Sequence, residues 1–292
     1  MPKVIPNYGD KAQKIEGQLN ILVAGSHGGM VDTMILANIN PVSRRITLTS
    51  LPRDLYYNNR KINSIYGLYG MEELKRTIAF VTGFQVDKYI LIDMYAFIDV
   101  IDLIGGIDVH LDEPVIDPTY KTLDGGKWGT LYYRAGDHHL SGKQALRLAR
   151  TRHTSSDFVR SERQHLILAA LQEKAKSFGL GDASGLKILA KQVLAKTETD
   201  ISMAEAIAYF FRYQSFEING GNVISTDNVL LSKFANDEGY AIAGCPTTKN
   251  SSEEQKEKCS KYDRGAYILV PKNDDWDTVR WYFRKIIKVD TL

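Results

Sequence analysis

Arginines gather in the middle of the chain, in a stretch where no lysine lies between Lys143 and Lys174. The five are Arg147, Arg150, Arg152, Arg160 and Arg163, and across that span only Asp157 and Glu162 offset their charge. A guanidinium holds phosphate oxygens in pairs through its rigid planar fork, whereas the ammonium of lysine is a point charge. The cluster therefore favours a diphosphate ligand, although a solvated basic face with ordinary ion pairs has the same composition.

Two other positions carry groups that suit the same ligand. Arg53 and Asp54 end a predicted strand, and residues at strand ends often line sites in α/β proteins. Asp32 opens the strand after a glycine-rich loop, where a carboxylate could bind Mg²⁺, a cation that prefers oxygen ligands. Taken alone, each position also fits a structural role, as an Arg-Asp turn pair or as a carboxylate that caps a turn.

The remaining candidate motifs are weak. The loop Gly25-Ser26-His27-Gly28-Gly29 lacks the Gly-Lys-Ser/Thr ending of a P-loop, and no predicted helix follows it. His138-His139 has no partner carboxylates at metal-ligand spacing, so we expect a structural role for this pair. No serine lies in a nucleophile-elbow pattern. The arginine cluster thus remains the strongest chemical signal.

Elements that would position these residues follow from the pattern of apolar residues. The first half predicts strands over 18–24, 33–39, 45–51, 88–92 and 107–111, and helices over 71–81 and 95–104. Residues 112–137 are rich in Asp, Gly, Pro and Tyr and predict a long surface loop. The second half predicts helices over 145–150, 161–177, 185–196, 203–214 and 276–287, and strands near 228–232 and 266–270. Capping boxes at Ser141/Gln144 and Ser202/Glu205 mark two helix starts.

Composition limits the class of protein. A chain of 292 residues with 43% hydrophobic and 25% charged residues is typical of soluble globular proteins. A net charge of +2 is too small for a general nucleic-acid binder. No apolar stretch of about 18 residues predicts a membrane span, so either the protein is soluble or its anchor has been removed. Cys245 and Cys259 could close a disulfide around a polar loop, as in an extracytoplasmic protein, or be two free thiols.

Several motifs, taken in order, resemble the LytR-CpsA-Psr family over roughly residues 19–178. They are NILVAG, VDTMILANINPVSRRITLTSLPRDLYY, KINSIYGLYGMEELKRTI, DLIGGIDVHLDEPVIDP and YRAGDHHLSGKQALRLARTRHTSSDFVRSERQ. The resemblance implies an α/β fold, a three-layer α-β-α sandwich with a mixed central sheet. We expect a flexible segment over 1–18, a catalytic and lipid-binding core over 19–180, and a C-terminal part over 181–292 packed on the same domain.

The family's function sets the expected activity. Its members move teichoic acids, capsule or other glycopolymers from a polyprenyl-pyrophosphate carrier to peptidoglycan, with Mg²⁺, on the extracytoplasmic face of the membrane. The resemblance therefore implies a transferase whose partners are the lipid-linked polymer, the peptidoglycan acceptor and the membrane surface, without nucleic acid. It places the pyrophosphate clamp on Arg53, Arg150, Arg152 and Arg160, and an acidic metal position on Asp32. Asp54, Asp157 and Arg163 also match motif positions.

One loop departs from the family pattern. His27 stands where the family has its first aspartate, and Gly29 and Met30 stand where arginines are expected. A neutral imidazole is a poor Mg²⁺ ligand. His27 could be a substitute ligand or a proton acceptor. Alternatively, the protein binds polyprenyl phosphate or glycan without turning it over, or it is a pyrophosphatase.

Overall fold

The computed structural model describes residues 12–124, 126–151, 157–178, 183–235 and 266–287. Its strands are β1 (Leu19–His27), β2 (Met30–Asn40), β3 (Arg45–Leu51), β4 (Tyr56–Tyr57), β5 (Arg60–Lys61), β6 (Lys88–Asp93), β7 (Ile107–Leu111), β8 (Val115–Asp124), β9 (Lys127–Tyr133), β10 (Gly136–Leu140), β11 (Glu198–Thr199), β12 (Glu217–Val223), β13 (Leu230–Phe234) and β14 (Tyr267–Pro271). Its α-helices are α1 (Ile65–Tyr69), α2 (Met71–Thr82), α3 (Met94–Leu103), α4 (Gly142–Arg150), α5 (Asp157–Phe178), α6 (Ala183–Ala195), α7 (Met203–Tyr213) and α9 (Trp276–Ile287).

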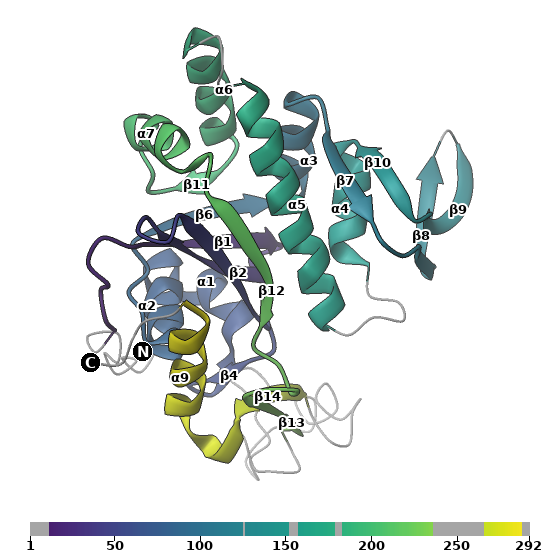
Figure 1. Ribbon diagram of the computed structural model, residues 1–292. Helices are drawn as coiled ribbons and strands as arrows, with labels where there is room; N and C mark the ends of the chain where they lie inside the picture. The colour runs from purple at the N-terminus through teal and green to yellow at the C-terminus, as the bar shows by residue number, and fades with distance from the viewer. Residues whose placement is uncertain (1–11, 125, 152–156, 179–182, 236–265, 288–292) are drawn as a thin grey trace. The chain divides into compact units, whose positions relative to one another are not determined.

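A six-stranded mixed sheet organises these elements, with strand order β11-β6-β1-β2-β3-β12 (Figure 1). This confirms the predicted α/β class with a mixed central sheet. The chain forms two compact units. The first unit comprises Met1–Leu36, Ser50–Asp87 and Ile224–Leu292, and the second comprises Ala37–Thr49 and Lys88–Val223.

In the first unit, the glycine-rich loop is a tight hairpin turn. Strand β1 continues through His27, and only Gly28 and Gly29 separate it from β2. Both glycines have positive φ, 56° and 79°, as the central residues of a type I′ turn require. A Cβ on Gly67 of α1 would lie 2.4 Å from the carbonyl oxygen of Gly29, so only glycine allows α1 to approach this turn. The Gly-Gly pair is thus explained by backbone geometry.

Helix α2 of the first unit begins and ends as its sequence predicts. It ends at Gly83, whose φ of 78° is left-handed and whose N–H donates to the carbonyl of Ala79. Arg280 of α9 donates to the carbonyl of Phe80 and lies over the Phe80 ring, with its Cζ 4.4 Å from the ring centroid. Tyr57 contacts the same ring at a tilt, and Trp276 contacts it edge to face. The aromatic cluster therefore joins α2, α9 and strand β4.

The second unit has its own hydrophobic core. Helices α3, α4 and α5 pack with the antiparallel pair β7–β10 around fully buried side chains such as Ile101, Ile107 and Leu148 (Figure 1). The capping box at Ser141 and Gln144 starts α4, as predicted. Burial along β7 alternates strictly, which is the pattern of a strand with one face on the core.

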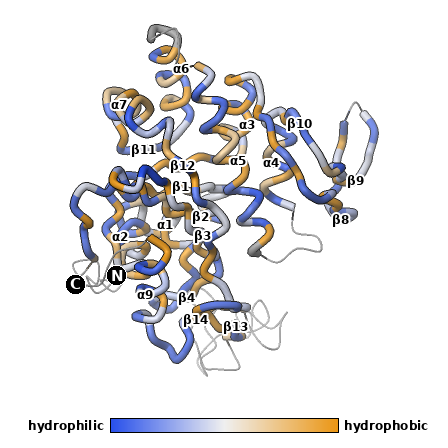
Figure 2. Tube along the Cα trace, in the orientation of Figure 1, coloured by the Kyte–Doolittle hydropathy of each residue, from blue (hydrophilic) through white to orange (hydrophobic). Residues whose placement is uncertain are grey.

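The prediction of a long surface loop over 112–137 is wrong. Strands β8 and β9 form an antiparallel hairpin there, followed by β10. The pairing register shifts between Asp117 and Lys121, and this irregularity of β8, which we call its bulge, breaks the alternation that would reveal a strand. Figure 2 shows this hairpin as mostly hydrophilic. Strand β12 was also not predicted, because Gly220 and Gly221 weaken its strand pattern.

Candidate functional site

In the first unit, the predicted site residues Asp32, Arg53 and Asp54 lie together. Arg53 follows β3, and its Nη1 donates to Oδ1 of Asp32, from β2, at 2.9 Å. Its Nε lies 3.5 Å from Oδ2 of Asp54, and Lys61 Nζ donates to the other oxygen of Asp54 at 2.6 Å. The four side chains form a row of alternating charge, Asp32–Arg53–Asp54–Lys61.

Electrostatics within this row favour the charged form of Arg53. Partial burial opposes the charge, but the hydrogen bond to Asp32 and the charges of Asp54 and Asp32 outweigh it and raise the pKa of Arg53. The side chains of Arg53 and Asp32 remain 30% and 41% exposed, so a ligand can reach both. Lys61, which holds the far end of the row, was not predicted as a site residue.

The resemblance implies Mg²⁺, and the residues around Asp32 fit it in one respect. Mg²⁺ commonly takes one or two carboxylates and completes its shell with phosphate oxygens and water. Asp32 can supply such an oxygen, in competition with Arg53. Among the described residues, no group of three or more His, Cys, Asp or Glu side chains is placed to hold a metal ion. His27 is exposed at the end of β1.

In the second unit, arginines flank the junction between α4 and α5. Arg150 is the exposed last residue of α4. Arg160, one turn into α5, is only 7% exposed, and Arg163 follows it on the same helix. Burial lowers the pKa of Arg163. Arg152 and the side chain of Asp157 fall outside the described residues, as do Cys245 and Cys259.

A network that sequence reasoning missed fixes this junction at Thr151. The buried hydroxyl of Thr151 donates to Oδ2 of Asp117 at 2.6 Å. Arg163 Nη1 donates to the backbone carbonyl of Thr151 at 3.1 Å. Gln164 of α5 also donates to the carbonyl of Ala149. The residue next to Arg150 is thereby held by both β8 and α5. Asp117 precedes a proline and a threonine, a turn-forming sequence that could have marked it.

Asp117 keeps its charge despite burial. The residue is 3% exposed, and burial by itself disfavours the anion. Hydrogen bonds from the side chains of Thr119 and Thr151 and from the backbone N–H groups of Thr119 and Tyr120 overcome that cost and hold the pKa of Asp117 well below its ordinary value. A buried anion thus anchors the junction that carries the arginines.

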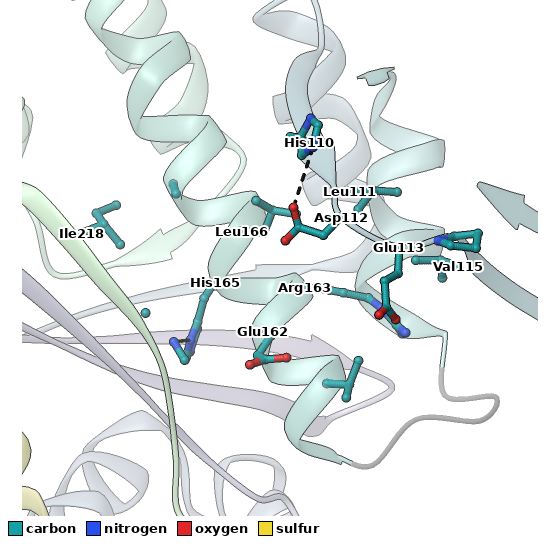
Figure 3. Close-up of a pocket in the computed structure, with 15 residues that line it drawn as sticks. His110, Leu111, Asp112, Glu113, Val115, Glu162, Arg163, His165, Leu166 and Ile218 are labelled. Carbon is teal, nitrogen blue, oxygen red and sulfur yellow. Dashed lines mark hydrogen bonds and ion pairs between the residues drawn. The ribbon is translucent and has the colours of Figure 1, made fainter. Parts of the chain in front are cut away.

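An open groove of about 510 Å³ lies beside this junction in the second unit. Strand β7 and the turn after it, the first half of α5 and the middle of β12 line it, and Figure 3 shows its charged side chains. Its polar lining includes His110, Asp112, Glu113, Glu162, Arg163 and His165. Arg163 therefore belongs to both the groove and the Thr151 network.

Arg147 and the His138-His139 pair, both noted in the sequence, contact other residues of the second unit. Arg147 forms a two-pronged ion pair with Asp124, through Nη1 at 2.6 Å and Nη2 at 2.9 Å, although its own side chain is buried rather than part of a solvated face. His139 Nδ1 lies 2.6 Å from Asp108 Oδ1 on the neighbouring strand, and His138 Nε2 lies 2.8 Å from the carbonyl of Arg134. Both rings are occupied by contacts within the second unit, in line with the structural role expected for them.

Comparison with known proteins gives consistent matches. The model of the LytR_cpsA_psr family matches residues 6–257. The polyisoprenyl-teichoic acid–peptidoglycan teichoic acid transferase TagV of Bacillus subtilis (strain 168) is 30% identical over 198 residues, which are 64% of this chain and 49% of TagV. Biofilm regulatory protein A of Streptococcus mutans serotype c (strain ATCC 700610 / UA159) is 26% identical over 194 residues, 61% of this chain and 46% of that protein. The chain thus spans about half the length of these two relatives.

Solved structures show the same fold. The crystal structure of B. subtilis TagV aligns with a TM-score of 0.66 over 95% of this chain and 100% of that one, at 22% identity. TagT bound to LIIa-WTA aligns with a TM-score of 0.66 over 94% of this chain and 92% of that one, at 20% identity. Within the described part of the chain, no helix is both long and apolar enough to cross a membrane.

Proposed function

Because the chain belongs to the LytR-CpsA-Psr family, we propose that it transfers a glycopolymer from a polyprenyl-pyrophosphate carrier to peptidoglycan. The observation that carries the proposal is the junction after α4, where the Asp117–Thr151–Arg163 network holds the backbone beside Arg150. The relative TagV is named as a transferase of this kind, and the TagT structure contains LIIa-WTA, which supports the substrate class.

The reaction is a phosphoryl transfer. A hydroxyl of the wall glycan attacks the phosphorus that bears the polymer, a new P–O bond forms, and the bond to the bridging oxygen breaks. The polyprenyl phosphate leaves with that oxygen, and the proton of the hydroxyl passes to a base. Such a reaction needs little covalent help from the protein, so positioning and charge stabilisation carry the catalysis.

We assign pyrophosphate contacts to Arg53, Arg150, Arg152, Arg160 and Arg163. The resemblance supports each assignment, and the fixed charge of arginine suits it. Asp54 acts as a positioning residue for Arg53, and Lys61 in turn pairs with Asp54. Asp157 remains a supporting position by resemblance. Asp32 would hold Mg²⁺, which supplies Lewis-acid stabilisation of phosphate oxygens when bound. His27 is assigned as a substitute ligand or proton acceptor.

A second function is favoured by the loop around His27. With a histidine at the first acidic position and no three-ligand group among the described residues, the protein could bind a polyprenyl phosphate or glycan without turnover. Turnover of a polyprenyl-pyrophosphate donor with Mg²⁺, abolished by Asp32→Ala, would exclude this function. Release of polyprenyl phosphate together with free polymer phosphate, with no polymer joined to peptidoglycan, would instead indicate a pyrophosphatase.

The test uses a purified polyprenyl-pyrophosphate glycopolymer as donor and measures both the polymer joined to peptidoglycan fragments and the polyprenyl phosphate released. Each lost charged contact to phosphate costs roughly 1.5–3 kcal/mol, about 10- to 150-fold in kcat/KM. We expect Arg53→Ala and Arg150→Ala each to lose at least tenfold. Arg45→Ala is the matched control, because Arg45 forms an exposed pair with Glu217. Full activity in both site variants would refute the assignment.

The substrate also sets the cellular location. A polyprenyl carrier stays in the bilayer and peptidoglycan lies outside it, so we place the protein at the extracytoplasmic membrane surface. Labelling of intact cells with an impermeant reagent tests this, because a protein inside the cell would be protected.

A further inference from the structure

One face of the β8–β9 hairpin exposes apolar and aromatic side chains in register. Cross-strand partners Ile116 and Tyr132 lie at one end of the face, and Leu123 and Trp128 at the other. Between them stand Lys121 and Thr130. We call these six residues the exposed hairpin face. Of the 14 exposed large hydrophobic residues in the described part of the chain, these two pairs supply four, which makes the face a cluster.

Exposure on this face is high. Trp128 is 75% exposed, Tyr132 63%, Ile116 50% and Leu123 44%. Residues directly opposite each other in an antiparallel pair share a face, so both apolar pairs lie on the same face of the hairpin, on either side of Lys121 and Thr130. Burying large apolar side chains stabilises a protein, so their exposure together points to a contact partner.

The opposite face holds the hairpin against the second unit. Val115, Leu131 and Tyr133 are buried, and the Tyr133 hydroxyl donates to the carbonyl of Gln144 in α4. Near the tip, Asp124 accepts both prongs of Arg147. The hairpin is therefore fastened at its base and near its tip, and Figure 1 shows it extending beyond α4 and β10. Because one face is anchored, the other keeps its outward orientation.

Charge distinguishes between the possible partners. The exposed hairpin face contains Lys121 and no carboxylate, and Lys127 stands at the tip. The carboxylate near the tip, Asp124, is neutralised by Arg147 and Lys143. The surface is thus apolar with a positive charge. A sugar-binding surface would also carry carboxylate or amide side chains that hydrogen-bond the sugar hydroxyls. The six residues of the exposed hairpin face include neither.

We propose that the exposed hairpin face docks on the surface of a bilayer that contains anionic phospholipids. Tryptophan and tyrosine rings favour the headgroup region, where aliphatic side chains enter the acyl boundary and lysine extends to the phosphates. The biological setting rests on the proposed function, which places the protein at a membrane. The docking itself requires neither the arginines nor the transfer reaction.

The test uses the whole chain and vesicles of phosphatidylcholine with or without phosphatidylglycerol, free of any glycopolymer carrier. We expect anionic vesicles to co-sediment the protein at least tenfold more strongly than neutral ones. Trp128→Ser/Tyr132→Ser should lose this binding at least tenfold. Lys121→Gln should lose about fivefold, because one basic residue near an anionic surface contributes about 1 kcal/mol.

Trp281 provides a matched control, since it is 55% exposed on α9 and lies away from the hairpin in sequence. Trp281→Ser should bind vesicles as the parent does. Brominated lipids should quench the tryptophan fluorescence of Trp281→Phe, which keeps Trp128, much more than that of Trp128→Phe. This difference reports contact between Trp128 and lipid even if the variants still bind vesicles. Equal binding by the parent and the double variant, no vesicle binding by the parent, or preference for a soluble glycan or a second copy would overturn the proposal. If the protein binds vesicles but has no transfer activity, only the proposed function is refuted. If it transfers polymer but does not bind vesicles, only the docking is refuted.

Discussion

His165 offers a quantitative test of how α5 is packed in the second unit. The ring is 3% exposed, and its Nδ1 accepts a hydrogen bond from the backbone N–H of Gly221 at 2.8 Å. Burial lowers the pKa of His165 to about 4. A proton on Nδ1 would break the bond to Gly221, and Gly220 packs closely against the same side chain. We predict that the folded protein keeps His165 neutral down to about pH 4.

The sign of the effect on stability follows from proton linkage. The unfolded chain binds the proton near pH 6.5, whereas the folded chain binds it only near pH 4. Stability from this group is therefore complete above about pH 6.5 and declines as the pH falls towards 4, because the unfolded state then holds one more proton. With these two pKa values the loss at pH 4.5 is about 2.5 kcal/mol.

The perturbation is His165→Gln, whose amide oxygen can accept the same hydrogen bond without titrating. Histidine-selective NMR follows the six histidines, and the resonance missing in the variant identifies His165. Urea unfolding at pH 7.0 and 4.5 should show the parent losing about 2.5 kcal/mol more than the variant. A His165 resonance that titrates near pH 6.5, or equal losses in both proteins, would refute the buried-neutral assignment.

Three further predictions concern the supports of the site and the hairpin. Thr151→Val should cost about 1.5–3 kcal/mol by urea unfolding, because a buried carboxylate loses a donor, while Thr151→Ser should cost much less. Gly29→Ala should cost about 1–2 kcal/mol in the same assay and Gly29→Asn less, because φ is 79° and no atom crowds the new Cβ; equal costs would point to sterics instead. Arg147→Met should speed amide exchange in β8 and β9 and leave β6 unchanged, and uniform exchange across both would argue against Asp124 as the anchor.

Local signals explain which elements the sequence predicts. Helices α2 and α4 carry their own boundary marks, a left-handed Gly83 and a capping box at Ser141, and both are confirmed. Strands β2 and β3 are also confirmed, because their two apolar runs flank a turn. The β8–β9 hairpin could not be predicted from such signals. The bulge after Asp117 breaks the alternation of apolar and polar residues, and the outward face of the hairpin is itself apolar.

The candidate site shows the same division. Arginines are visible in the sequence because composition alone marks them, and Arg53 lies where the strand-end argument puts it, beside Asp32 and Asp54. Their supports are not visible, because hydrogen-bond partners such as Asp117 and Thr151 are 34 positions apart. Nothing in composition distinguishes Arg147, which binds Asp124, from Arg150, which is exposed.

Asp117 links the hairpin to the arginines. Its Oδ1 accepts from Thr119 and Tyr120, which fixes the bulge of β8, and its Oδ2 accepts from Thr151, which fixes the backbone beside Arg150. One buried anion therefore sets both the orientation of the exposed hairpin face and the junction between α4 and α5. Because each set of hydrogen bonds helps to keep the carboxylate charged, neither can be lost without weakening the other. Within the second unit, the surface proposed to meet the bilayer and the arginines proposed to meet the carrier's pyrophosphate are thus positioned by the same side chain.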